Sequence, residues 1–186
     1  MKRYFLIVML AGLGLSAIIG IYVFIAGSFK ETEIRLLLTT VDIGLFSLMG
    51  LCAAIWFDRR ELLPLAYTSL VVSAIALVIG ILTIWEVFEA SDETMLKLFG
   101  TSAISATALA YVSLIFLLRG DSNVVRNTIY FATGCLSVIW FMLVGLIIFE
   151  WDVEESYFRM LGVFSILTIT ATIAAPILKK ILAMQR

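Results

Sequence analysis

The stretch ETMLKL at residues 93–98 shares a pattern with two other stretches of this chain: a glutamate, a Thr or Ser, two variable positions, a Lys or Arg, and a Leu or Met. The other copies are ETEIRL at residues 31–36 and ESYFRM at residues 155–160. Successive copies lie 62 residues apart. A fixed period of this size indicates repeated structural units. The pattern therefore predicts three similar units in a chain of 186 residues.

The composition places these units in a membrane. Apolar residues make up 62% of the chain and charged residues only 15%, whereas an ordinary soluble domain carries about 25% charged residues. A net charge of -1, without a basic cluster, argues against a nucleic-acid partner. The chain has no histidine, which removes the usual ligands of haem and zinc and the commonest general base. We therefore expect a lipid bilayer as the surroundings and no cofactor.

Six apolar runs are long enough to cross a hydrocarbon core about 30 Å thick. Pro176 is expected to bend or end the last of them near Lys179 and Lys180, because proline lacks the backbone N–H that a helix needs. The three copies of the motif fall on the connections that precede the second, fourth and sixth runs. The expected spans are residues 4–29, 36–57, 64–85, 98–118, 128–149 and 157–178.

Each repeated unit holds two spans, so all three units enter the membrane in the same direction. Inverted repeats, which many transporters use, need an odd number of spans in each unit. The expected fold is therefore an all-α membrane protein of three parallel hairpins packed as a pseudo-threefold bundle. The hairpins are residues 1–60, 61–121 and 122–186.

The distribution of charge predicts the orientation. Nine of the thirteen Lys and Arg residues lie at the two termini and in the links after the second and fourth spans. Ten of the fourteen Asp and Glu residues lie on the opposite side, with the motifs. Because Lys and Arg of short loops concentrate on the cytoplasmic side, both termini should be cytoplasmic, in a bacterial inner membrane, with the motifs outside.

The motif itself has two interpretations. Its glutamate precedes its cation by four residues, which is the favourable order for an ion pair in the first turn of a helix. The three copies would then be simple helix starts. Alternatively, the charged residues surround the outer end of a central axis and form a selective entrance, as charge rings do in channels. The candidate ring consists of Glu31, Arg35, Glu93, Lys97, Glu155 and Arg159.

Asp42 is the one acidic residue expected inside the membrane, and it has no counterpart in the other two units. A carboxylate at such depth costs about 2.5–3.5 kcal/mol on insertion scales, which makes it a functional-site hypothesis by default. It could bind a cation or carry a proton, with Thr39 as a neighbour. The alternative is a structural residue near the interface that is satisfied by Thr39 or Arg35.

Three classes of function follow. A non-enzymatic structural or accessory subunit, or a modulator of a larger membrane complex, fits the short loops and the lack of a catalytic constellation. A transporter or channel for a small cation or solute fits Asp42 and the Ser and Thr residues of the even-numbered spans, which could hydrate a path or simply join helices. An intramembrane enzyme fits least, because one carboxylate without a histidine or a second acid is not a catalytic set. We expect a membrane subunit first and a transporter second.

Overall fold

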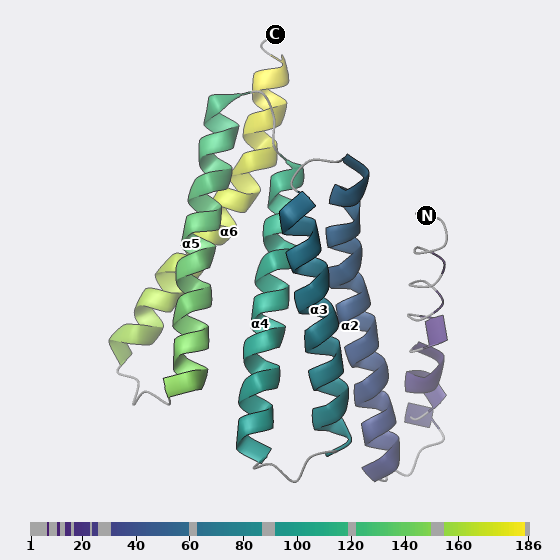
Figure 1. Ribbon diagram of the computed structural model, residues 1–186. Coiled ribbons are helices and arrows are strands. Elements are labelled where there is room, and N and C mark those ends of the chain that lie inside the picture. Colours follow the sequence, from purple (N-terminus) through teal and green to yellow (C-terminus); the bar gives the residue numbers. More distant parts are fainter. Residues whose placement is uncertain are drawn as a thin grey trace. The chain divides into compact units, whose positions relative to one another are not determined.

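The computed structural model contains only helices in the part of the chain that it describes (Figure 1). The described residues are 7, 11, 14, 15, 17–22, 24, 25, 31–59, 63–86, 92–118, 122–149 and 155–184. Those between 7 and 25 are helical, so they agree with a first span, but both expected boundaries of that span, residues 4 and 29, lie outside the described residues.

Five complete helices follow, and each is long and apolar enough to cross a bilayer. The chain is therefore a multi-pass membrane protein, as its composition predicts. The helices are α2 (Glu31–Arg59), α3 (Leu63–Ile84), α4 (Asp92–Leu117), α5 (Asn123–Phe149) and α6 (Glu155–Met184).

The repeated motif lies in the first turn of a helix rather than in a connection. α2 and α6 begin at the motif glutamates Glu31 and Glu155, and α4 begins one residue before Glu93. Acidic residues in a first turn are stabilised by the positive end of the helix dipole, which explains why these helices start earlier than the apolar runs indicate.

Of the two effects expected of Pro176, an end of the helix near Lys179 is wrong, because α6 continues through Pro176 to Met184, whereas a bend stays a prediction. The proline N–H is missing where it would have bonded the carbonyl of Thr172. Membrane helices tolerate this loss, since nearby hydroxyls and small local adjustments satisfy the freed carbonyl.

The chain divides into two compact units, Met1–Ala106 and Thr107–Arg186, with the boundary inside α4. In the first unit α2 packs against α3, and the buried residues Phe46, Ala76 and Ala106 join them to the first part of α4. In the second unit α5 packs against α6. Its buried residues are Ile115, Val125, Ile129, Ala132, Ala171 and Ala175. The three-hairpin division and its pseudo-threefold packing remain predictions.

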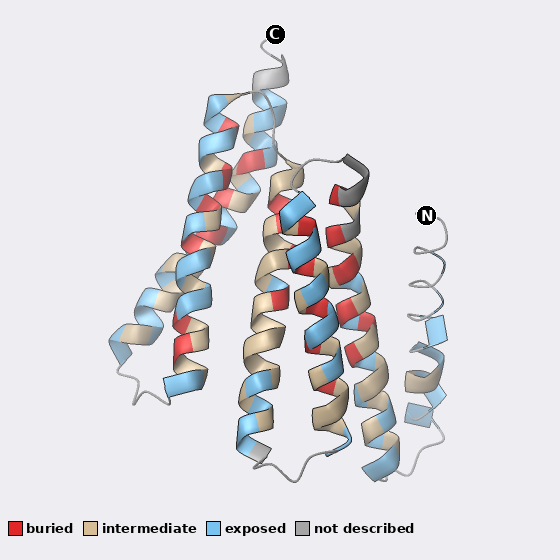
Figure 2. Ribbon diagram, in the orientation of Figure 1, coloured by how far each residue is buried: buried red, intermediate tan, exposed pale blue. Residues whose placement is uncertain are grey.

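The helices have broad apolar faces that lie outside the α2–α3 and α5–α6 contacts and are exposed. Figure 2 shows buried residues along the inner faces of the helices and exposed residues along the others. On α3, for example, Val71, Ile75 and Val78 are about half exposed, whereas Ser73 and Ala76 are buried. Exposed apolar faces of this kind suit contact with lipid.

A candidate carboxylate site between α2 and α3

The three motif glutamates each form an ion pair with the cation four residues later. The nitrogen-to-oxygen distances are 2.6 Å for Arg35 and Glu31, 3.0 Å for Lys97 and Glu93, and 2.8 Å for Arg159 and Glu155. The expected pairs at the helix starts are therefore present. The gathering of all six residues around one axis stays a prediction, because the motifs belong to two separate units.

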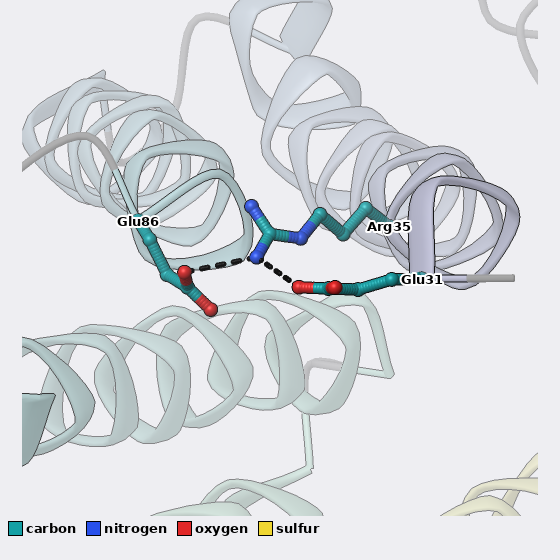
Figure 3. A network of polar contacts seen from close by, with 3 residues as sticks. All are labelled: Glu31, Arg35 and Glu86. Atoms are coloured by element: carbon teal, nitrogen blue, oxygen red, sulfur yellow. Dashed lines mark hydrogen bonds and ion pairs between the residues drawn. The ribbon is translucent and has the colours of Figure 1, made fainter.

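The first copy of the motif also connects two helices. Arg35 Nη2 donates to Glu31 Oε1 and lies 2.9 Å from Oε2 of Glu86, which follows α3 (Figure 3). The side chain of Arg35 is 22% exposed, whereas that of Arg159 is 74% exposed. Arg35 thus joins the beginning of α2 to the end of α3.

Glu86 reaches this position through an uncommon backbone conformation. Its φ angle is 47°, which lies in the left-handed region that side chains other than glycine rarely adopt. This conformation ends α3, with the N–H of Trp85 bonded to the carbonyl of Ile81 and the N–H of Glu86 bonded to that of Thr83. Trp85 Nε1 also donates to Thr39 Oγ1 of α2 at 3.1 Å, so two side chains fix this end of the α2–α3 interface.

Asp42 lies deeper in the same interface and is only 5% exposed. Asp42 lies about 16 Å from Glu31 along the axis of α2, at a rise of 1.5 Å per residue. Its carboxylate fits because residue 80 of α3 is glycine. A Cβ atom there would lie 2.6 Å from Oδ2 and 2.7 Å from Oδ1 of Asp42, and 2.8 Å from a ring carbon of Phe99. The Asp42 carboxylate and the Phe99 ring therefore both lie close to the backbone of Gly80.

Thr39 and Arg35 are the neighbours expected to hydrogen-bond Asp42, but neither bonds its Oδ2 atom. Within the described residues this buried oxygen has no hydrogen-bond partner. Thr39 donates to the carbonyl of Arg35 and accepts from Trp85, while Arg35 pairs with Glu31 and Glu86. A buried acceptor without a partner is costly, so Asp42 is not explained as a structural residue that Thr39 or Arg35 satisfies.

An apolar layer follows Asp42 along the interface. Phe46 is one turn further along α2 and packs with Ala76, one turn back along α3 from Gly80, and with Ala106 of α4. Asp42 beside Gly80 and Phe46 beside Ala76 define an antiparallel register of the two helices. Partly buried Met49, Val72, Leu77, Phe99 and Ala103 complete this layer.

Two buried serines of α3 come next in that register, and sequence reasoning missed them. Ser73 is 3% exposed and Ser69 is fully buried. Their Oγ atoms have no hydrogen-bond partner in the part of the chain that the structure describes. The signal was present, since Ala66, Ser69, Ser73, Ala76 and Gly80 are small residues spaced three or four apart on one helix face.

Most other hydroxyls in the spans serve packing or their own helix. Thr83 donates to the carbonyl of Ile79, Ser105 to that of Thr101, and Thr168 to that of Phe164. The Tyr111 and Thr172 hydroxyls bond each other at 2.7 Å and join α4 to α6 within the second unit. Of these bonds, the one between Tyr111 and Thr172 is the contact between helices that the packing interpretation expects for the even-numbered spans.

These features define the protein by class as a polytopic helical membrane protein with a buried carboxylate in one helix contact. The described residues contain no group of three or more acidic or cysteine side chains that could hold a metal ion. Comparisons with protein-family models, with known proteins and with solved structures find no match to this chain.

Proposed function

We propose that this protein is a non-enzymatic transporter that binds and releases a proton at Asp42 as it moves protons, or a small cation, across the membrane. The observation that supports this proposal most is the Oδ2 atom of Asp42, which is buried in a span and has no partner among the described residues. Ionisable residues at membrane depth are rare and commonly belong to ion pathways or proton relays.

The immediate surroundings of Asp42 favour a proton over a metal cation. Gly80 offers the carboxylate only its backbone surface, and the ring of Phe99, which also lies close to Gly80, carries no oxygen ligand. Sodium or potassium would need several oxygen ligands to replace its water shell, as the carbonyl rings of selective channels do. A proton needs only the carboxylate oxygen itself.

Polar residues connect this position to the end of the interface at Glu31. Thr39 lies nearly one turn before Asp42 on α2, and Thr83 lies nearly one turn beyond Gly80 on α3. Beyond them are Arg35 and its ion-pair partners. This sequence of polar side chains supports access to Asp42 from the end of the α2–α3 interface at Glu31.

The test is proton flux into vesicles that contain the purified protein and a pH-sensitive dye. Asp42→Asn should reduce the flux to that of empty vesicles, because the amide cannot release a proton, whereas Asp42→Glu should retain part of it. Lys180→Gln is the control, since it also replaces a charged group by an amide, at an exposed position outside the candidate ring. Flux in the Asn variant equal to wild type, or wild-type vesicles no more permeable than empty ones to protons, sodium and potassium, would contradict the proposal.

A second candidate is the accessory subunit of a membrane complex. It is supported by the short connections, which span three residues between α2 and α3 and five between α4 and α5. Nearly all recognition would then occur through the helix faces. This candidate predicts that a second membrane protein co-purifies in stoichiometric amount in mild detergent. A homogeneous preparation of this chain alone would count against it.

The proposed direction of access also depends on orientation. We propose a bacterial inner membrane with both termini in the cytoplasm, as the distribution of Lys and Arg indicates. Reporter fusions after Arg60, Glu93 and Arg186 test this, with a periplasmic signal expected only at Glu93. A cytoplasmic signal at Glu93 would reverse the assignment.

A further inference from the structure

The α2–α3 interface alternates between polar and apolar layers. From the start of α2 it holds the ion pairs of Arg35, then Asp42, then the apolar layer of Phe46, and then the two serines Ser73 and Ser69. Asp42, Ser73 and Ser69 are each more than nine-tenths buried and carry an oxygen without a partner among the described residues.

The positions of these layers follow from the register. Phe46 lies about 6 Å beyond Asp42 along α2, at 1.5 Å per residue. Ser73 lies three residues from Ala76 along α3, which places it at the level of Met49, and Ser69 is one turn further, at the level of Ala53. Asp42 and Ser73 are therefore about 10 Å apart along the helix axis, with only the apolar layer between them.

We propose that Phe46 is the gate of a proton path that runs from Asp42 to Ser73 and Ser69. This inference rests on the proposed function of Asp42 and adds the second half of the path. When the Phe46 ring moves aside, water enters the apolar layer and takes the proton from the Asp42 carboxyl group as hydronium. The serine hydroxyls then pass it on, each accepting one proton and donating another.

Phe46 suits this role because its buried neighbours are small. Ala76 and Ala106, the other two buried residues of the layer, have only a methyl group each. The phenyl ring therefore supplies much of the volume that keeps the centre of this layer dry. Apolar constrictions of this kind control pores by excluding water, and Phe46 lies near the middle of α2.

The serines suit the role because their hydroxyls are not used by their own helix. Thr68 and Thr83 of the same helix donate to carbonyls within one turn. Ser69 and Ser73 lie on the face that packs against α2, and no such bond is present among the described residues. A hydroxyl both donates and accepts a hydrogen bond, which a proton relay requires.

The experiment measures proton flux in vesicles for Phe46→Ala and for the double variant S69A/S73A. Phe46→Ala should raise the flux about tenfold, because the apolar barrier is lost. S69A/S73A should lower it about tenfold, because the relay beyond the barrier is lost while side-chain volume barely changes. Phe131→Ala on α5, whose side chain is 54% exposed, is the control for loss of a phenyl ring and should match wild type.

The outcomes separate this inference from the proposed function. Flux that depends on Asp42 but is unchanged in both Phe46→Ala and S69A/S73A overturns the gate and the relay while leaving Asp42 as a proton site. If the raised flux of Phe46→Ala persists in the double variant F46A/D42N, that flux is a leak that does not use Asp42. This result also overturns the proposed path.

A variant that does not fold is replaced by one that keeps more of the core. If Phe46→Ala is not recovered as a folded protein, Phe46→Leu carries the test, with a smaller increase in flux expected and an unchanged flux contradicting the gate. A separate measurement uses Ser73→Cys in a background where Cys52 and Cys135 are serine. This cysteine should react with a small water-soluble thiol reagent from the side opposite Asp42, and a cysteine that stays unreactive from both sides overturns the second half of the path.

Discussion

The α2–α3 contact of the first unit and the helix contacts of the second unit are built from similar apolar helices, but their polar groups differ in hydrogen bonding. In the second unit the Tyr111 hydroxyl bonds that of Thr172, and the Tyr157 hydroxyl donates to the carbonyl of Met142. At the α2–α3 interface, by contrast, oxygens of Asp42, Ser69 and Ser73 are buried without a partner among the described residues. Hydrogen bonds between paired polar groups stabilise the association of helices in lipid. Helix packing therefore does not explain the buried oxygens of the α2–α3 contact.

The two arginines of the motif show the same difference. Arg159 is exposed and pairs with Glu155 of its own helix. Arg35 is largely covered and also pairs with Glu86, across the interface. The same sequence pattern therefore gives a surface ion pair in one region and a connection between helices in the other.

The largest expected effect is at Gly80. Gly80→Ala places a Cβ atom 2.6 Å from Asp42 Oδ2 and 2.8 Å from the ring of Phe99. Overpacking of this kind costs about 1–3 kcal/mol. Gly162→Ala of α6 is the control, since a Cβ there meets nothing within 4 Å, and it should be neutral or slightly stabilising. Equal free energies of unfolding for the two variants, measured by reversible denaturation in mixed micelles, would refute the described contact.

Replacement of Asp42 itself should stabilise the protein. Asp42→Ala removes a buried oxygen without a partner and introduces a better helix former, so the free energy of unfolding should rise by about 1–2 kcal/mol. The same denaturation assay measures it, and the flux assay should show the activity lost. A less stable variant would mean that Asp42 makes a bond that contributes to the fold.

The paired hydroxyls of the second unit should behave in the opposite way. Tyr111→Phe loses the bond to Thr172 and should lower stability by about 0.6 kcal/mol, the average for such bonds in a membrane protein. Ser73→Ala loses a hydroxyl that has no partner among the described residues and should leave stability unchanged or slightly higher. Similar losses in the two variants would remove the contrast between the two contacts.

The smallest effects are expected at the arginines. Arg35→Gln should lower the apparent Tm in detergent more than Arg159→Gln does, because only the first change breaks a contact between helices. Exposed pairs within one helix contribute about 0.3–0.5 kcal/mol at most, so Arg159→Gln should be near wild type. High salt should narrow the difference by screening both sites. The reverse ranking would show that the link to Glu86 contributes little.

The membrane spans could be predicted from the sequence because an apolar run of the right length has few alternatives. The helix starts were placed too late, since hydropathy does not register that charged residues such as Glu31 and Arg35 can occupy a first helical turn. Pro176 does not end α6, since a helix in lipid tolerates an internal proline better than the rule for helices in water indicates.

The site could be predicted only in part. Asp42 stands out in sequence because a carboxylate in an apolar run is rare. Gly80 and Glu86 could not be connected to it or to Arg35, because the register between α2 and α3 decides those contacts and is not visible in either helix alone. Ser73 and Ser69 were overlooked because hydroxyls were counted per helix rather than by helix face.

The face that α3 turns toward α2 has a mechanical consequence. Ala66, Ser69, Ser73, Ala76 and Gly80 carry nothing larger than a hydroxymethyl group, so this face has no tall ridges to interlock with its neighbour. A smooth face permits shear, the small sliding of one packed helix past another. A shift of α3 by part of a turn would change which backbone atoms face the carboxylate without unfolding either helix.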